Sequence, residues 1–97
     1  MAEVVYSGRS LQDIKRAFQF LRTEIPSAAL DAVAAIQSAV GNLRAHPLIG
    51  RRMAGELREL VISYGRTGYV ALYRFVIAQD QLRILALRHQ RELGFLP

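Results

Sequence analysis

The 97-residue sequence contains no cysteine, so disulfide bonds and thiolate metal sites are excluded. It has no apolar run near the roughly 18 to 20 residues that a membrane-spanning helix needs. It also does not begin with a basic segment followed by an apolar one, the pattern typical of a secretory signal. We therefore expect a cytoplasmic protein that does not associate with a membrane.

Lysine is nearly absent, because 12 of the 13 basic residues are arginine and only Lys15 is lysine. The net charge of +5 indicates an acidic partner, either nucleic acid or an acidic protein surface. Arginine suits such a contact surface because its planar fork binds carboxylates and phosphates through two hydrogen bonds. A genome rich in G and C would produce the same bias, and this explanation stays open.

The apolar content of 52% can supply one core, but so short a chain leaves substantial apolar surface uncovered. We expect one domain over residues 1–97 and a permanent protein partner.

Two helices are predicted after a short strand at residues 4–6. Ser10 fits an N-cap with Asp13 three residues later, as in a capping box, while Pro26 ends the first apolar pattern and Ser27 can cap the second. Matching apolar seams and a tight connection predict an antiparallel helical hairpin rather than a dimeric coiled coil, the alternative for such stripes. The two stripes are Leu11, Ile14, Phe18, Leu21, Ile25 and Ala29, Val33, Ile36, Val40, Leu43, of which Ile14, Leu21, Val33, Ile36 and Val40 are predicted core.

Three strands are predicted at residues 57–64, 69–77 and 82–87, after a surface loop at 46–55. The fold class is therefore α+β: a short N-terminal strand and an antiparallel helical hairpin packed on an antiparallel sheet, in the order β-α-α-β-β-β. The hairpin can cover only one side of this sheet. We expect the other side to form a groove for a partner, with Tyr73, Val61 or Leu85 emerging there.

Few residues suggest catalysis. No spacing of His, Asp and Glu indicates a metal site, and Gly65 and Gly68 bracket a hairpin turn rather than open a phosphate-binding helix. The cluster that could carry chemistry comprises Arg88, His89, Arg91 and Glu92, since arginine can stabilise an anionic transition state and histidine can move a proton. The structural alternative is that Arg88 and Glu92 tie the last strand to neighbouring loops.

Several short motifs occur in a fixed order along nearly the whole chain. They are the helical pair, Pro47-x-x-Gly50-Arg51, Arg58-Glu59-Leu60, Gly68-Tyr69, Tyr73-Arg74 and Arg88-His89-x-Arg91-Glu92. In this combination the sequence resembles the RelE/ParE toxin superfamily of bacterial type II toxin–antitoxin systems, and its ParE branch in particular. The resemblance implies a helical hairpin on an antiparallel sheet. It also implies a ParD-like antitoxin that wraps the toxin in a hetero-oligomer and binds operator DNA through a ribbon-helix-helix domain.

The resemblance also separates two activities. RelE-like members cut messenger RNA on the ribosome with cations on the sheet and a late tyrosine, whereas ParE-like members poison DNA gyrase and lack those groups. The positions of the sheet cations correspond to Val61, Ser63 and Val70, and no tyrosine follows Tyr73, although Arg91 matches a basic position of the nuclease. We therefore expect a ParE-like gyrase inhibitor that stabilises plasmids or arrests growth, and not an enzyme.

The expected sites follow from this interpretation. Arg88, Arg91, Glu92 and Phe95 are expected to bind the target, and Arg58, Tyr73, Arg74 and Leu85 to bind the antitoxin. We expect no catalytic residue, metal or cofactor. The alternative is a metal-independent, ribosome-dependent endoribonuclease that uses Arg88, His89 and Arg91. A third interpretation is a degenerate, non-toxic scaffold that only titrates its antitoxin.

Overall fold

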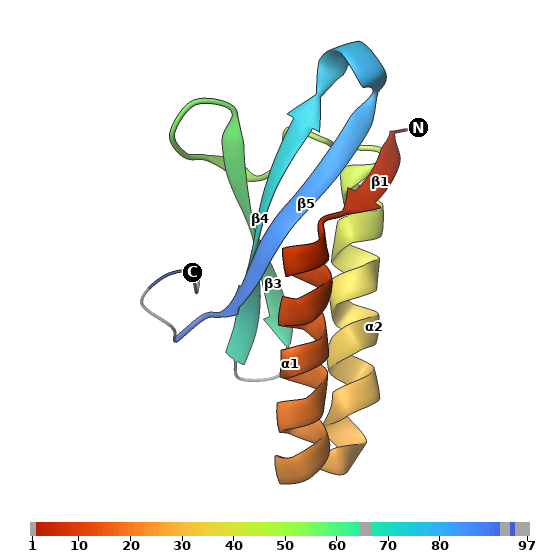
Figure 1. Ribbon diagram of the computed structural model, residues 1–97, viewed down its shortest axis with the longest axis vertical. Helices are drawn as coiled ribbons and strands as arrows, with labels where there is room; N and C mark the ends of the chain where they lie inside the picture. Colours follow the sequence, from red (N-terminus) through yellow and green to blue (C-terminus); the bar gives the residue numbers. More distant parts are fainter. Residues whose placement is uncertain (1, 65–66, 92–93, 95–97) are drawn as a thin grey trace.

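The computed structural model describes residues 2–64, 67–91 and 94. Two helices lie side by side against one face of a twisted sheet, which confirms the predicted α+β class (Figure 1). The elements in chain order are β1 (Glu3–Tyr6), α1 (Gly8–Glu24), α2 (Pro26–Leu43), β2 (Arg51–Arg52), β3 (Leu57–Tyr64), β4 (Thr67–Val76), a single 3-10 turn (Ile77–Gln79) and β5 (Gln81–His89).

The sheet has the strand order β1-β5-β4-β3-β2. All neighbours are antiparallel except β1 and β5, which pair in parallel through residues 3–6 and 81–84. The predicted antiparallel sheet is confirmed for β2 to β5, and the short N-terminal strand joins it in parallel at one edge. A parallel pair requires a long crossover, and the helices together with β2 to β4 provide it. The strand β2 was missed because two residues are too few to show an alternating pattern.

The first helix begins three residues earlier than predicted. Its N-cap is Ser7, whose Oγ accepts a hydrogen bond from the backbone N–H of Ser10 at 3.0 Å. Ser10 lies inside the first turn, where its hydroxyl donates to the carbonyl of Ser7. The predicted cap at Ser10 was wrong because a second serine, three residues upstream, occupies the extended conformation that an N-cap needs.

The second helix begins at Pro26, after Ile25 as a one-residue connection. No side chain caps this helix, so the predicted capping role of Ser27 was wrong. Proline suits the first helical position because its ring fixes φ and it has no N–H that requires a partner. The antiparallel hairpin itself is confirmed.

The main core lies between the helical hairpin and the sheet. Ile36 and Val40 are buried as predicted, while Ile14, Leu21 and Val33 are only partly buried. The turn between the helices extends beyond the end of the sheet (Figure 1), so Ile25 is exposed. Leu11 is exposed as well. The buried members of the core are Ala2, Ala32, Ile36, Val40, Leu43, Ile62, Tyr69, Ala71, Tyr73, Leu82, Ile84 and Leu87.

The opposite face of the sheet carries no helix, and we call it the open face. Leu60 and Ile62 contact the core, so Val61 between them points to the open face, where it is 60% exposed as expected. Tyr73 was expected there, but this was wrong, because its side chain is fully buried in the core. Leu85 is half-buried beside a register shift at Leu72/Tyr73.

Among the described residues, neither helix is long and apolar enough to cross a membrane.

Candidate functional site

A hollow of about 430 Å³ lies between α1 and the end of β5, and we call it the α1/β5 hollow. It brings together Arg88, His89 and Arg91, which the sequence had grouped only by their adjacency. Glu92 and Phe95, also expected to bind the target, lie outside the described residues. The lining comprises Asp13, Arg16, Ala17, Phe20, Tyr69, Leu87, Arg88, His89 and Arg91.

The edge of β5 beside this hollow is closed by α1 rather than by a strand. β1 pairs only as far as Ile84 of β5, and the next backbone groups bond to side chains. The hydroxyl of Ser7 donates to the carbonyl of Leu85 at 2.9 Å. The carboxylate of Asp13 accepts a hydrogen bond from the N–H of Leu87, also at 2.9 Å. This end of β5 is therefore fixed against the first half of α1.

Asp13 carries its charge in a nearly buried position, with 5% of its surface exposed. Arg9 and Arg16 lie one turn away on either side, with N–O distances of 3.8 and 3.5 Å. These are loose contacts, and both arginine side chains remain about half exposed. The carboxylate thus binds the sheet directly while the two guanidinium groups stay close to solvent.

Two rings form one wall of the hollow. Tyr69 and His89 are register partners on β4 and β5, and their ring centroids lie 5.5 Å apart in an edge-to-face arrangement. Burial, with the nearby Tyr64 as a second cause, raises the pKa of Tyr69 above 10.0, so this phenol is neutral at pH 7. The Nδ1 of His89 accepts a hydrogen bond from the N–H of Arg91 at 3.1 Å, which holds the chain just beyond β5.

The open face of the sheet carries an ion cluster. Glu59 is 9% exposed and lies 3.0 Å from Arg51 and 3.9 Å from Arg88. Two guanidinium groups therefore share one nearly buried carboxylate. Such a cluster keeps the positive charge of Arg88 partly balanced at the edge between the open face and the α1/β5 hollow.

The three positions that the sequence resemblance matched to nuclease cations share this open face. Val61 and Val70 are direct register partners, and Arg88 is in turn the partner of Val70. Ser63 is two residues beyond Val61 and therefore points to the same side. Val61 and Ser63 are exposed and Val70 is buried. Next to Arg88, this part of the face thus exposes one valine side chain and one hydroxyl, and the second valine is buried.

A second site holds the loop at residues 46–50. The hydroxyl of Tyr73 accepts a hydrogen bond from the N–H of Gly50 and donates one to the carbonyl of Pro47, both at 2.9 Å. Arg58 donates to the carbonyls of Leu48 and Gly50 at 3.0 and 2.9 Å. Gly50 is needed because a Cβ there would lie 2.5 Å from Cε1 of Tyr73 and 2.8 Å from the carbonyl oxygen of Glu59.

The four residues expected to bind the antitoxin are therefore in different surroundings. Arg58 and Tyr73 are register partners and anchor the 46–50 loop. Arg74 forms an ion pair with Glu56 at 3.0 Å. Leu85 lies at the opposite side of β4, next to α1. Arg74 and Leu85 are half-buried, so part of each residue remains open to solvent, whereas Tyr73 is fully buried beneath the loop that it holds.

The sequence interpretation missed Asp13, Arg16, Phe20 and Glu59. Asp13 was assigned to a helix cap, and Glu59 is one polar residue in an otherwise apolar strand. The sequence did contain a signal for Glu59. It is a carboxylate within a predicted buried strand, and an arginine pair that could balance it begins eight residues earlier. Within the described residues, no three His, Asp or Glu side chains are grouped as metal ligands.

Comparisons with known proteins agree with the fold and the motifs. The family described as the ParE toxin of the type II toxin–antitoxin system parDE matches residues 4–94. A protein named Toxin RelE3 from Caulobacter vibrioides is 35% identical over 92 residues, which cover 95% of this chain and 98% of that protein. A solved structure titled chromosomal ParDE TA system from P. aeruginosa superposes with a TM-score of 0.75 at 22% identity, covering 92% of this chain and 96% of that one. The chain therefore belongs to the ParE toxin family of type II toxin–antitoxin systems, within the RelE/ParE superfamily.

Proposed function

We propose that this toxin arrests growth by binding DNA gyrase, as a protein inhibitor rather than as an enzyme. The observation that supports this most is the row of Val61, Val70 and Arg88 across the open face. Metal-independent cleavage of RNA requires several preorganised groups around the developing negative charge. Here the neighbouring positions are apolar, and Arg88 shares the carboxylate of Glu59 with Arg51.

The proposed gyrase-binding surface is formed by Arg88 and Arg91 at the end of β5, with Glu92 and Phe95 beyond. Both arginines line the α1/β5 hollow, where the chain is fixed by the Asp13 contact to Leu87. A rigid surface with exposed positive charge can approach an enzyme–DNA complex with electrostatic guidance. Gyrase inhibition would then depend on these side chains without any bond being made or broken by the toxin.

The proposed antitoxin is an acidic, ParD-like protein that binds the open face. The net charge of +5 and exposed apolar side chains such as Val61 support it, because an acidic amphipathic segment gains apolar burial and steering together. Arg74 and Leu85 are its proposed direct contacts, and Arg58 and Tyr73 support it through the 46–50 loop. Operator DNA is bound only by the ribbon-helix-helix part of the antitoxin.

Co-expression with the protein encoded next to the toxin gene tests the antitoxin proposal. We expect a stable complex with nanomolar or tighter affinity. Binding no better than about micromolar, roughly 4 kcal/mol weaker, would contradict it.

One preparation of purified toxin tests the target in two assays. We expect it to inhibit gyrase supercoiling and to leave translation in a cell-free system unchanged. A toxin that binds its antitoxin but does not arrest growth on induction would instead be the degenerate scaffold.

The second candidate is a ribosome-dependent endoribonuclease. It is favoured by the name of the relative Toxin RelE3 and by the placement of Arg88, His89 and Arg91 around one hollow. In this case translation assays would show cleaved messenger RNA, and His89→Ala would abolish cleavage while the variant remained folded. Gyrase supercoiling would be unaffected.

A further inference from the structure

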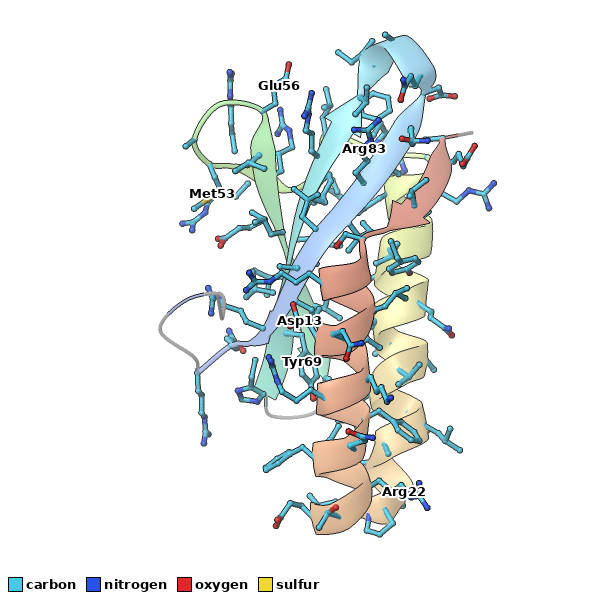
Figure 2. The ribbon with its side chains drawn as sticks, viewed as in Figure 1. Asp13, Arg22, Met53, Glu56, Tyr69 and Arg83 are labelled. Carbon is cyan, nitrogen blue, oxygen red and sulfur yellow. The ribbon has the colours of Figure 1, made fainter. Side chains whose placement is uncertain are left out.

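The walls and the volume of the α1/β5 hollow suit a small ligand. Its α1 wall consists of Asp13, Arg16, Ala17 and Phe20, which recur at helical spacing and so face the same side. Its other wall is formed by Tyr69 and the end of β5. Figure 2 shows Asp13 and Tyr69 at adjoining positions between α1 and this end of the sheet. The volume of about 430 Å³ is within the range of small-ligand sites.

The hollow has more positive than negative charge. Three arginines line it, against the single carboxylate of Asp13, although one of them, Arg88, is partly balanced by Glu59. That carboxylate already accepts the N–H of Leu87, and Arg16 contacts it only loosely at 3.5 Å. Arg16 is about half exposed and Arg91 is exposed, so both can turn toward an incoming anion. Arginine binds phosphate with two parallel hydrogen bonds, which favours a phosphate group as that anion.

An uncovered aromatic ring stands beside these cations. Phe20 is 64% exposed although it lines the hollow, one turn along α1 from Arg16. On the opposite wall, Tyr69 is buried and packs edge to face with His89. A planar base can stack on Phe20, which would cover apolar surface that is otherwise in water.

We propose that the α1/β5 hollow binds a phosphate-bearing nucleotide, with the phosphate on Arg16 and Arg91 and the base on Phe20. The ligand is a free nucleotide or one unit of a single-stranded nucleic acid, since both present the same chemistry. The proposal does not depend on whether gyrase is the target of the toxin.

An acidic peptide fits this hollow less well. An extended peptide would bind by adding a strand to the β5 edge, and that requires the N–H of Leu87. Asp13 already occupies this donor from a nearly buried position. The hollow also lies at the β5 edge and is therefore separate from the open face, where Val61, Ser63 and Val70 lie and where the acidic antitoxin segment is proposed to bind.

The test is a titration of the purified toxin followed by amide NMR shifts. The probes are adenosine 5′-monophosphate, adenosine, inorganic phosphate and a short oligothymidylate. We expect the monophosphate to shift the amides of Arg16, Phe20 and Leu87 and to bind at least about fivefold more tightly than phosphate alone, because stacking adds to the phosphate contact. Tighter binding of the oligothymidylate than of the monophosphate identifies single-stranded nucleic acid as the source, and the reverse order identifies a free nucleotide.

Three variants complete the test. Arg16→Ala should weaken monophosphate binding about tenfold or more, and Phe20→Ala about fivefold or more. Arg22→Ala is the matched control, since Arg22 is an exposed arginine of α1 at the far end of the hairpin (Figure 2) and does not line the hollow. It should bind as the wild type does. Circular dichroism checks that each variant is folded.

Several results would overturn the proposal. One is that neither the monophosphate nor the oligothymidylate shifts any amide. Another is that Arg16→Ala binds the monophosphate as tightly as the wild type does. A third is that an acidic peptide binds in the same hollow more tightly than the monophosphate. The titration contains neither gyrase nor ribosomes, so its outcome is separate from that of the gyrase proposal.

Discussion

The carboxylate of Asp13 on α1 accepts a hydrogen bond from the backbone N–H of Leu87 on β5, across 74 residues of sequence and 2.9 Å of space. A side chain thereby takes the place of a neighbouring strand at the edge of the sheet. This contact fixes the helical hairpin relative to the end of β5, where Arg88, His89 and Arg91 lie.

Replacement of Asp13 by alanine should destabilise the protein by about 1 to 3 kcal/mol, because the N–H of Leu87 would lose its acceptor in a buried position. Asp13→Asn should cost less, since the amide oxygen can still accept. Urea unfolding measures both. Asp31→Ala, an exposed acidic residue of α2, is the control and should change stability by no more than about 0.5 kcal/mol. Equal stability of Asp13→Ala and the control would contradict the role assigned to this contact.

Tyr73→Phe should also destabilise by about 1 to 3 kcal/mol, because the N–H of Gly50 and the carbonyl of Pro47 lose a buried partner. The loop at 46–50 should then exchange its amide hydrogens faster. Tyr6→Phe provides a control, because the Tyr6 hydroxyl has no hydrogen bond to any described residue. If both variants had the same stability and exchange, the hydroxyl of Tyr73 would not be holding the loop.

Ile36→Ala should reduce the free energy of unfolding by about 2 to 5 kcal/mol, since Ile36 is buried between α2 and the sheet. Any loss of toxicity should come from unfolding alone. Leu30→Ala on the same helix is the comparison, because Leu30 is 74% exposed, and its effect should be small. Thermal unfolding of the two variants decides the point, and an unchanged Ile36→Ala would mean that the helix face is misassigned.

Stability should fall as the pH rises above about 10. Burial raises the pKa of Tyr6, Tyr69 and Tyr73 above 10.0, although the N–H of Gly50 and the charge of Arg58 lower that of Tyr73 in part. The folded state therefore keeps these protons at a pH where the unfolded chain releases them, so the stabilisation is complete below the unfolded pKa and is lost above it.

Urea unfolding at about pH 9 and about pH 11 measures this loss. Tyr73→Phe should lose less stability over this interval than the wild type does. A wild-type protein that became more stable at the higher pH would contradict the assignment.

The helices and long strands could be predicted because their signals are local. The three-four spacing in 29–43 and the β-branched run in 57–64 each extend over several repeats, and the structure has these elements there. The buried side of α1 was harder to predict. Its hydrogen bonds to β5 are made by the N-cap residue Ser7 and by Asp13, two polar residues that an apolar pattern passes over.

The candidate site was only partly predictable for the same reason. Arg88, His89 and Arg91 are adjacent in sequence, so their grouping needed no tertiary information. Arg16 and Phe20 join them only because α1 packs against the end of β5. Tyr73 was expected on the open face together with Val61, because alternation gives two faces but does not say which one is covered. The register pairs Val61 with Val70, and Tyr73, three residues further along β4, therefore points to the covered face.

The central proposal, that the toxin acts on gyrase through the end of β5, is tested most directly by DNA cleavage. Purified toxin is added to gyrase and supercoiled plasmid, and the linear DNA trapped in the cleaved state is measured, with in-vitro translation in parallel. Wild type should accumulate cleaved DNA and leave translation unchanged. Arg91→Ala, folded and still bound by antitoxin, should accumulate less cleaved DNA, because truncating a buried contact arginine costs about 2 kcal/mol. Arg22→Ala should accumulate as much cleaved DNA as the wild type. Gyrase left untouched while messenger RNA is cut on ribosomes would contradict the proposal and establish the nuclease instead.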